Sequence, residues 1–281
     1  ITATKSSDDM AKTYTAAKVR VYTDERTYTE HNLHYNTLFN VKDKVGRNSH
    51  PAGQLYNYKM EPILDPMGKP VIAETPDANS LLNVEGKLFL VTHYEYDWLL
   101  SNGNRVWKQE NWYSRMPMGM TLTSIEQERN GQLKAIDQKP IDFSSVDGLW
   151  IPCFGSQTPW NTHLGSEEDY DLYYNAGVYE ARREAGVKAL SEVYFDNTKE
   201  ANPYHYGYIT EVEVKKDASY NITKHYVMGK GTWEMAKVLD DGRTAYFGDD
   251  GKNVGMFMFV ADKKNDLSSG TLYAAKWMQT S

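Results

Sequence analysis

The chain is built around short apolar segments that recur at intervals of roughly ten residues, with Gly, Asp and Asn between them. Residues 206–214 alternate apolar and polar side chains with a period of two, as half-buried strands do. Asp-Asp-Gly turns at 240–242 and 249–251 separate successive segments. Regular spacing of this kind predicts an antiparallel all-β fold. The predicted strands are 17–22, 87–94, 149–153, 206–214, 224–228, 232–239, 244–247, 255–260 and 271–277.

One stretch departs from the strand pattern. Residues 177–193 contain helix formers with apolar spacing, although Gly186 weakens the pattern. We predict an all-β fold, a β-propeller that is complete or partial, with a helical insertion near 177–195. Four strands within 224–277 would form one blade. A β-sandwich is the alternative, because no clean sequence repeat supports the blades.

Composition excludes several classes of protein. The formal net charge is −7 and no basic patch dominates, so we expect no nucleic-acid partner. No run of 18 apolar residues exists, so we expect no transmembrane segment. A single cysteine rules out an internal disulfide framework.

Residues 1–20 are predicted to form a polar arm that leads into the first strand. We interpret residue 1 as the mature end of an exported protein or a fragment boundary.

The only cysteine, Cys153, lies a short loop ahead of Glu167 and Glu168. Thiolate is a soft ligand and carboxylate a hard one, and a mixed set suits iron better than zinc or calcium alone. Asp169 and Asp171 extend the acidic cluster, which favours a bound cation. Two plainer interpretations stay open. A lone cysteine is often simply buried, and an acidic run is often a solvated loop.

Two strands carry further candidate ligands. Glu234 follows Trp233 in an apolar strand, which suggests a metal ligand or a general acid/base, or else an outward-facing side chain. His93, Glu95 and Asp97 fall on one face of a strand by their period of two, so they could form part of a metal site. The polar outer face of a half-buried strand is the alternative, and residue statistics favour it.

Asp249 and Asp250 form the last candidate group. With Gly251 and Asn253 they resemble a loop suited to calcium, although turn chemistry alone also accounts for them.

The familiar nucleophile-elbow, Walker A, dinucleotide and zinc-protease signatures are all absent from the sequence.

The segment around the cysteine resembles a known family signature. Cys153-x-Gly-x-x-Thr-Pro-Trp-x-Thr-x-Leu-x-x-Glu167-Glu168 is similar to the Cys-x-Gly-Gly-x-Thr-Pro-Trp-Gly-Thr-Trp-Leu-x-Cys-Glu-Glu stretch of PhoX-type alkaline phosphatases, with the same spacing. Weaker similarities follow in the family's order, from about residue 80 to the end. They are Val91-Thr-His93-Tyr-Glu95-Tyr, Tyr206-Gly-Tyr-Ile-Thr-Glu211, Gly229-Lys-Gly-Thr-Trp-Glu234, Tyr246-Phe-Gly-Asp249-Asp250-Gly and Gly270-Thr-Leu-Tyr273.

The resemblance implies a secreted or periplasmic phosphomonoesterase on a β-propeller. Its central site would hold iron and calcium, with a cysteine thiolate on iron. Cys153 would then be the iron ligand, and Glu168 and Glu234 carboxylate ligands of the cluster. The metal ions would clamp a phosphate ester substrate, and a metal-bound oxygen would attack phosphorus. The remaining candidate metal ligands are Glu167, Glu95, Asp249 and Asp250; no catalytic side chain is assigned.

The chain departs from the family pattern at several positions. Ser156, Asn161, His163 and Ser166 replace Gly, Gly, Trp and Cys, and Lys230 and Trp233 replace Arg and His. The family's downstream Arg-Pro-Glu motif does not occur in these residues. We therefore expect residues 1–281 to form a single propeller-like domain that is incomplete relative to the family. A further C-terminal segment or a partner chain would complete it.

Three functions stay open. The first is a metal-dependent phosphomonoesterase. The second is a non-catalytic propeller that acts as a surface, assembly or binding module, which the departures favour. The third is a calcium-dependent lactonase-type propeller. Cys153 argues against the third, because calcium has no use for a thiolate.

Overall fold

The structure is a computed structural model that describes residues 18–33, 35–96, 98–104, 109, 112–170, 172 and 180–278. The chain separates into two compact units, Ile1–Phe39 and Asn40–Ser281. The described part of the first unit is an antiparallel hairpin of β1 (Lys18–Tyr22) and β2 (Tyr28–Asn32). The predicted strand at 17–22 is therefore present, and most of the predicted arm lies outside the described residues. All other elements belong to the second unit.

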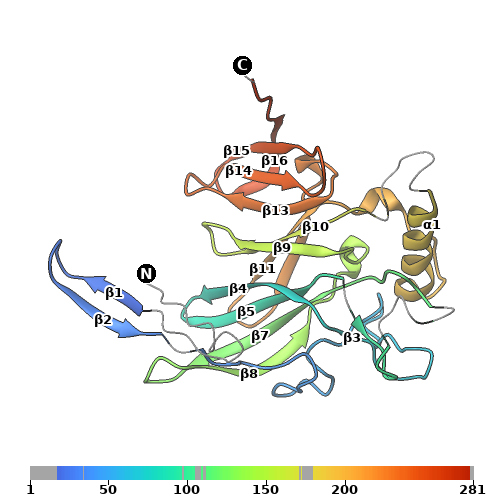
Figure 1. Cartoon of the computed structure of the whole chain (residues 1–281), viewed down its shortest axis with the longest axis horizontal. Helices are drawn as coiled ribbons and strands as arrows, with labels where there is room; N and C mark the ends of the chain where they lie inside the picture. Colours follow the sequence, from blue (N-terminus) through green and yellow to red (C-terminus); the bar gives the residue numbers. More distant parts are fainter. Residues whose placement is uncertain are drawn as a thin grey trace. The chain divides into compact units, whose positions relative to one another are not determined.

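Within the described residues, the second unit contains three four-stranded antiparallel sheets (Figure 1). The first sheet consists of β4 (Pro76–Val84), β5 (Lys87–Tyr94), β7 (Met120–Gln127) and β8 (Leu133–Pro140). The second consists of β9 (Pro152–Gln157), β10 (His163–Glu167), β11 (Ile209–Val214) and β12 (Tyr220–Lys224). The third consists of β13 (Trp233–Val238), β14 (Thr244–Asp249), β15 (Met256–Lys263) and β16 (Asp266–Ala274). Strands β3 (Ile72–Ala73) and β6 (Trp98–Leu99) form a separate two-stranded antiparallel sheet.

The three sheets stack in chain order like successive propeller blades. Strand β9 contacts β4 of the first sheet and β13 of the third, so the first strands of the sheets lie side by side. Phe89 and Val212 belong to the buried cluster between the first and second sheets. Leu164 and Phe259 belong to the cluster between the second and third. The predicted all-β, propeller-type architecture is confirmed.

The turns follow from local chemistry. Between β13 and β14, the Asp241 carboxylate accepts hydrogen bonds from the backbone N–H groups of Arg243 and Thr244, both at 2.9 Å. Gly242 adopts a φ of 67°, which a glycine tolerates without strain. The hairpin predicted from Asp-Asp-Gly therefore forms where the sequence places it.

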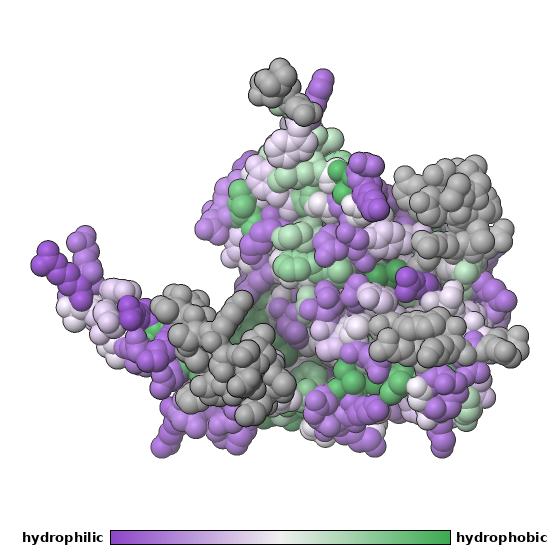
Figure 2. Space-filling view, viewed as in Figure 1, coloured by the Kyte–Doolittle hydropathy of each residue, from purple (hydrophilic) through white to green (hydrophobic). Residues whose placement is uncertain are grey.

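The visible face of the molecule is mostly hydrophilic, with hydrophobic residues in smaller patches (Figure 2).

The predicted helical insertion lies between β10 and β11. Helix α1 (Glu180–Ala189) continues into a π-helical turn, η3 (Leu190–Tyr194). Leu190 and Tyr194 are buried against Trp150 and Ile151. The start of the predicted segment, up to residue 179, lies outside the described residues. None of the described helices has the length and apolar character that a membrane crossing requires.

Two predicted strands are misplaced. Residues 224–228 were expected to be extended, but β12 ends at Lys224 and Tyr226–Met228 form a 3₁₀ turn. His225 turns inward there, with its Nε2 2.7 Å from Glu211. In the segment predicted at 149–153, only Pro152 and Cys153 are in a strand. Ile151 has a φ of 42°, which interrupts an extended run.

Candidate metal centre

An open pocket of about 390 Å³ lies where the three sheets meet. Each sheet contributes two metal-capable residues to its lining. They are Asp77 and Glu95 from the first sheet, Cys153 and Glu168 from the second, and Glu234 and Asp250 from the third. Tyr96, Arg115, Ile151 and Tyr170 complete the lining.

These six residues occupy the same two places in every sheet. Asp77, Cys153 and Glu234 are each the second residue of the sheet's first strand. The other three come directly after the sheet's second strand, at positions 95, 168 and 250. The structure therefore contains a threefold repeat that the sequence does not display, because different residue types fill equivalent positions.

Irregular strand pairing accompanies the site residues. In the first sheet the register shifts between Pro76 and Ala78, on either side of Asp77. In the third sheet it shifts between Trp233 and Met235, on either side of Glu234. In the second, a shift in β10 lies opposite Cys153. A β-bulge re-aims a side chain out of the normal alternation, and bulges are common beside functional sites.

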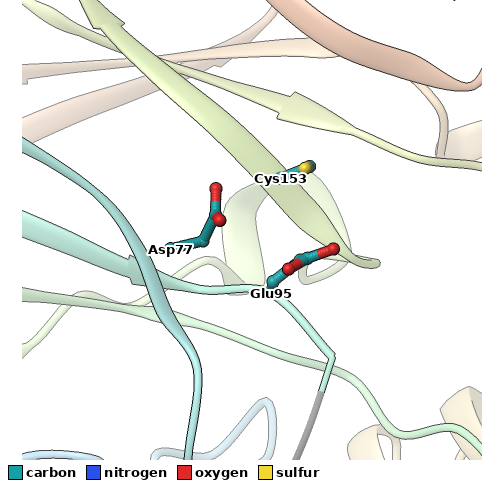
Figure 3. A group of neighbouring side chains, drawn as sticks. All are labelled: Asp77, Glu95 and Cys153. Carbon is teal, nitrogen blue, oxygen red and sulfur yellow. The ribbon is translucent and has the colours of Figure 1, made fainter. Parts of the chain in front are cut away.

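Cys153 belongs to two overlapping ligand groups. One contains Asp77 and Glu95, and the other contains Glu168 and Glu234; in each, the ligand atoms lie within 4.8 Å of one another. The Cys153 thiol also donates to Glu234 Oε2 at 3.6 Å. Figure 3 shows Asp77 and Glu95 reaching from the first sheet toward the strand that carries Cys153. One soft thiol among hard carboxylates is a donor set that can accept iron and calcium.

The electrostatics of the pocket favour a cation. Burial, a hydrogen bond with Glu234 and the charges of Glu234, Glu95 and Asp250 raise the pKa of Glu168 to about 9. Burial, followed by the surrounding carboxylates, raises the pKa of Cys153 as well. Both raised pKa values show that a further negative charge in the pocket is unfavourable. A cation bound among these groups would stabilise their ionised forms.

Two further side chains shape the pocket. The Tyr170 hydroxyl donates a hydrogen bond to Asp250 and lies 3.5 Å from Glu168 Oε1. Burial, followed by the hydrogen bond to Asp250, raises the pKa of Tyr170, so the phenol keeps its proton. The Arg115 guanidinium lies 5.3 Å from the Tyr96 ring and brings a positive charge to the lining.

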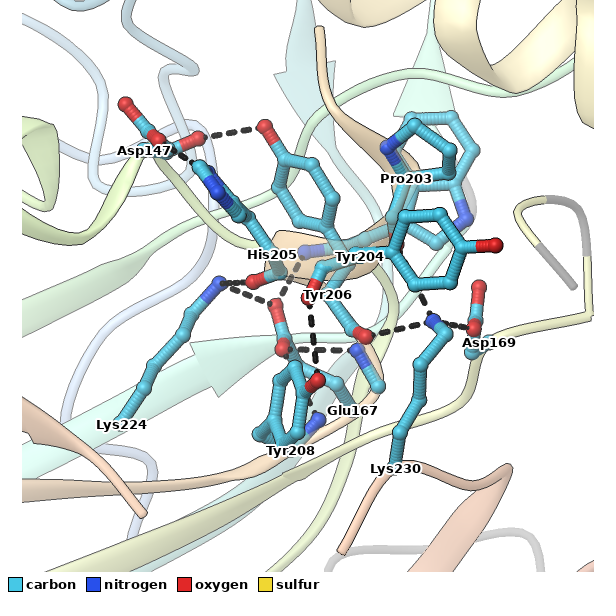
Figure 4. Close-up of polar contacts among 12 residues, drawn as sticks. Asp147, Glu167, Asp169, Pro203, Tyr204, His205, Tyr206, Tyr208, Lys224 and Lys230 are labelled. Atoms are coloured by element: carbon cyan, nitrogen blue, oxygen red, sulfur yellow. Dashed lines mark hydrogen bonds and ion pairs between the residues drawn. The ribbon is translucent and has the colours of Figure 1, made fainter. Parts of the chain in front are cut away.

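Glu167, a candidate ligand from the sequence, faces away from the pocket. Its carboxylate accepts hydrogen bonds from the backbone N–H groups of Trp150, Gly207 and Tyr208 at 2.9–3.2 Å. Lys224 lies beside Glu167 (Figure 4), with Nζ 3.0 Å from Oε1. Both side chains are fully buried. Glu167 is thus held by protein donors, whereas its neighbour Glu168 lines the pocket.

Asp169, on the other side of Glu168, forms a second buried ion pair. Lys230 contacts its carboxylate and also donates to the carbonyl oxygens of Tyr206 at 2.7 Å and Pro203 at 3.1 Å. The side chains of residues 167 and 169 are therefore both fixed by lysines. Since Lys230 stands where the PhoX pattern has Arg, the positive charge at this position is kept.

The Thr-Pro-Trp segment lies in the hairpin turn between β9 and β10 and does not line the pocket. Glu211 Oε1 accepts hydrogen bonds from Trp160 Nε1 at 2.8 Å and from Thr162 Oγ1 at 2.6 Å. His225 Nε2 lies 2.7 Å from Glu211 Oε2. The motif thus ties the hairpin tip to β11. Cys153 and Glu168 lie at the opposite, open end of the same hairpin.

The remaining predicted residues divide between pocket and surroundings. Asp249 is absent from the pocket lining, and its Oδ1 accepts the Thr232 N–H at 2.9 Å. Asp97 lies outside the described residues. Asp77 was not predicted from the sequence, although Pro76-Asp77 repeats the Pro152-Cys153 arrangement at the start of a first strand. Arg115 and Tyr170 were not predicted either, because no motif marks them.

Three blade-like sheets around an acidic, thiol-containing pocket define a propeller-type protein with a candidate metal centre. The family model described as alkaline phosphatase PhoX matches residues 131–280. That match covers more than half of the chain, and the chain belongs to the PhoX family. No curated protein matches this sequence.

A solved structure supports the fold. The chain resembles Pseudomonas fluorescens PhoX in complex with vanadate, a transition state analogue, with a TM-score of 0.56 and 19% sequence identity. The match covers 85% of this chain and 51% of the other. The chain therefore spans about half the length of that relative, and at this identity the likeness establishes the fold.

Proposed function

We propose that this chain is a metal-dependent phosphomonoesterase whose substrate, a phosphate ester, binds in the pocket between the three sheets. The observation that carries the proposal is the convergence of five carboxylates, one thiol and one guanidinium on a single pocket. Membership of the PhoX family supports the same reaction class. The vanadate complex of the Pseudomonas fluorescens relative supports a phosphate-like ligand.

The donor set fits the metals that the family resemblance implies. We propose that Cys153 binds iron, because its sulfur is the soft donor of the pocket. Asp77, Glu95, Glu168, Glu234 and Asp250 would hold iron and calcium through carboxylate oxygens. Bound there, the metal ions would neutralise the negative charge of the phosphoryl group, which is the main requirement of phosphoryl transfer.

The side chains of the pocket then have distinct tasks. Arg115 would bind phosphate oxygens through its planar fork of N–H donors. Tyr170 would hold Asp250 in place through its hydroxyl hydrogen bond. We propose a secreted or periplasmic location, in keeping with the family pattern.

Metal content and hydrolysis of p-nitrophenyl phosphate by the full chain test the proposal. We expect the wild type to contain iron and calcium and to release p-nitrophenol. Cys153→Ser should lose iron, and Glu168→Gln should lose both metal and activity. Glu213→Gln is the matched control, because Glu213 is exposed and pairs with Lys215 outside the pocket.

Each alternative outcome has a separate meaning. Metal binding without hydrolysis would favour the binding-module function. Full iron content and activity in Cys153→Ser would refute the assignment of Cys153. Hydrolysis of a lactone with calcium alone, and of no phosphate ester, would favour the lactonase-type function.

A further inference from the structure

A pair of histidines is buried between the first and second sheets, directly behind the pocket. His93 lies in β5 and His163 in β10, and both side chains are fully buried. His93 Nδ1 lies 3.2 Å from His163 Nε2, and the ring centroids are 5.2 Å apart. On its other side, His163 Nδ1 lies 2.7 Å from Ser80 Oγ, which is also buried. The three residues form a continuous polar chain inside an apolar interface.

The other end of this chain points to the pocket. His93 Nε2 is buried and has no hydrogen-bond partner among the described residues. The Asp77 carboxylate, which lines the pocket, lies 3.8 Å from it. Asp77 is exposed on a β-bulge. A distance of 3.8 Å is longer than a hydrogen bond, so a bond between the two residues requires the Asp77 side chain to turn toward His93.

The neighbouring backbone is shaped to hold the pair. A Cβ at Gly155 would lie 2.7 Å from His163 Cε1 and 2.9 Å from His93 Cε1. A Cβ at Gly165 would lie 3.3 Å from His93 Nδ1. Glycines on β9 and β10 therefore leave room for both rings. His163 stands where the PhoX pattern has Trp, so this chain has a polar link at a position that is apolar in the family pattern.

For two neutral rings, the contacts select one arrangement of protons. Burial, with His93 as a neighbour, lowers the pKa of His163, so this ring is neutral. If Ser80 donates to His163 Nδ1, then His163 Nε2–H donates to His93 Nδ1. His93 Nε2 then carries its proton toward the Asp77 carboxylate. The reverse arrangement would aim a lone pair of His93 at that carboxylate, which is repulsive.

We infer that His93, fixed in one tautomer by His163 and Ser80, is a positioning residue that orients Asp77 as a ligand in the cation site. This inference rests on the proposed function, since it presumes that cations bind in the pocket. Hydrogen bonds that orient a ligand carboxylate commonly change metal affinity 10–100-fold when they are removed.

Equilibrium dialysis of the full chain against buffered calcium tests the role of His93. His93→Asn keeps a polar contact for His163 but does not reach Asp77, whereas His93→Gln places an amide N–H near the position of the imidazole Nε2–H. We expect His93→Asn to bind calcium about 10–100-fold more weakly than the wild type, and His93→Gln to remain within about threefold of it. Leu82→Ala, a buried change in the same sheet, controls for lost stability and should bind calcium normally.

A double-mutant cycle tests the link to His163. His163→Phe should weaken calcium binding in the wild-type background and have no further effect in His93→Asn, because both changes act through the same contact. The inference is wrong if His93→Asn binds like the wild type, if His93→Gln is no better than His93→Asn, or if the effects of His93→Asn and His163→Phe simply add.

Imidazole ¹⁵N NMR spectra of the full chain provide a readout that does not depend on metal. They should show both rings protonated at Nε2, and Ser80→Ala should disturb His163. A proton on His93 Nδ1 would overturn the inference. A wild type that binds no cation would refute the proposed function and, with it, the role of Asp77. Normal calcium binding with insensitive variants would refute only the inference.

Discussion

At the scale of single residues, the orientation of Glu168 depends on its two neighbours. Glu167 is anchored by Lys224, and Asp169 by Lys230, in fully or largely buried ion pairs. Along an extended backbone, successive side chains point to opposite sides. With residues 167 and 169 fixed on one side, Glu168 is left to face the pocket.

Replacement of Lys224 should destabilise the fold strongly. Lys224→Met would leave the Glu167 carboxylate buried without its cation, a situation that costs about 3–5 kcal/mol. Urea unfolding measures the change in the free energy of unfolding. Lys215→Met is the control, because Lys215 and Glu213 form an exposed pair worth less than about 1 kcal/mol. Equal losses in the two variants would contradict this account of the buried pair.

The residue types of the site could be predicted only in part. Cys153, Glu168, Glu234, Glu95 and Asp250 were candidates from the sequence, and the structure places them all in the pocket lining. Spacing alone does not distinguish adjacent acids, although the family resemblance favours Glu168. Only the fold decides that residue 168 faces the pocket while residue 167 faces a lysine. Similarly, residue 249 bonds to the backbone of Thr232 and residue 250 lines the pocket.

At the scale of elements, the β9–β10 hairpin carries both Cys153 and Glu168 close to its open end. Its tip is fixed by Glu211. Burial alone would raise the pKa of Glu211, but hydrogen bonds from His225, Thr162 and Trp160 outweigh it and lower the pKa below its ordinary value of 4.5. A carboxylate with a lowered folded pKa stabilises the protein above the unfolded pKa. That stabilisation is lost as the pH falls through the folded pKa.

The lowered pKa of Glu211 predicts that its contribution to stability depends on pH. Glu211→Gln should lower the free energy of unfolding at pH 7 by about 1–3 kcal/mol, because the donors of Trp160, Thr162 and His225 lose an ionised acceptor. Below pH 4.5 the wild type should lose this advantage, so the two curves should converge. Urea unfolding from pH 7 to pH 3 measures both effects. A difference that stays constant over this range would contradict the assignment.

The contact between the first two sheets gives a second prediction at this scale. A Cβ at Gly155 would meet Ala78 Cβ at 2.9 Å as well as both histidine rings. Gly155→Ala should therefore destabilise the fold by about 1–3 kcal/mol through overpacking. Gly248→Ala is the matched control, because no atom lies within 4 Å of a Cβ at that strand position. Thermal unfolding compares the two, and equal melting temperatures would contradict the packing described.

The sequence predicts strands best where alternation and turns agree. Residues 87–94, 232–239 and 244–247 coincide with observed strands or overlap them closely. The strands β4, β7, β8 and β10 were not predicted, because their many polar and small residues give little alternation of apolar and polar side chains. The strand predicted at 224–228 was wrong because His225 turns inward to Glu211, a tertiary contact that local sequence does not show.

At the scale of the whole second unit, one pocket is shared by three sheets. Metal ions bound there would link sheets that otherwise meet through apolar cores. Removal of metal by a chelator should therefore lower the melting temperature by about 5–10 °C, since ligands bound only by the folded state stabilise it by mass action. Calorimetry with and without EDTA measures the shift. An unchanged melting temperature, with metal removal verified, would contradict the linkage.

We propose that equivalent positions of the three sheets form one cation site. The most direct test is the metal content, by elemental analysis, of Asp77→Asn, Glu168→Gln and Asp250→Asn beside the wild type. Asp249→Asn is the matched control, because residue 249 is adjacent to a pocket residue yet bonds to Thr232. We predict that each of the three variants loses iron or calcium and that Asp249→Asn retains both. Wild-type metal content in all three, or no metal in the wild type, would contradict the account.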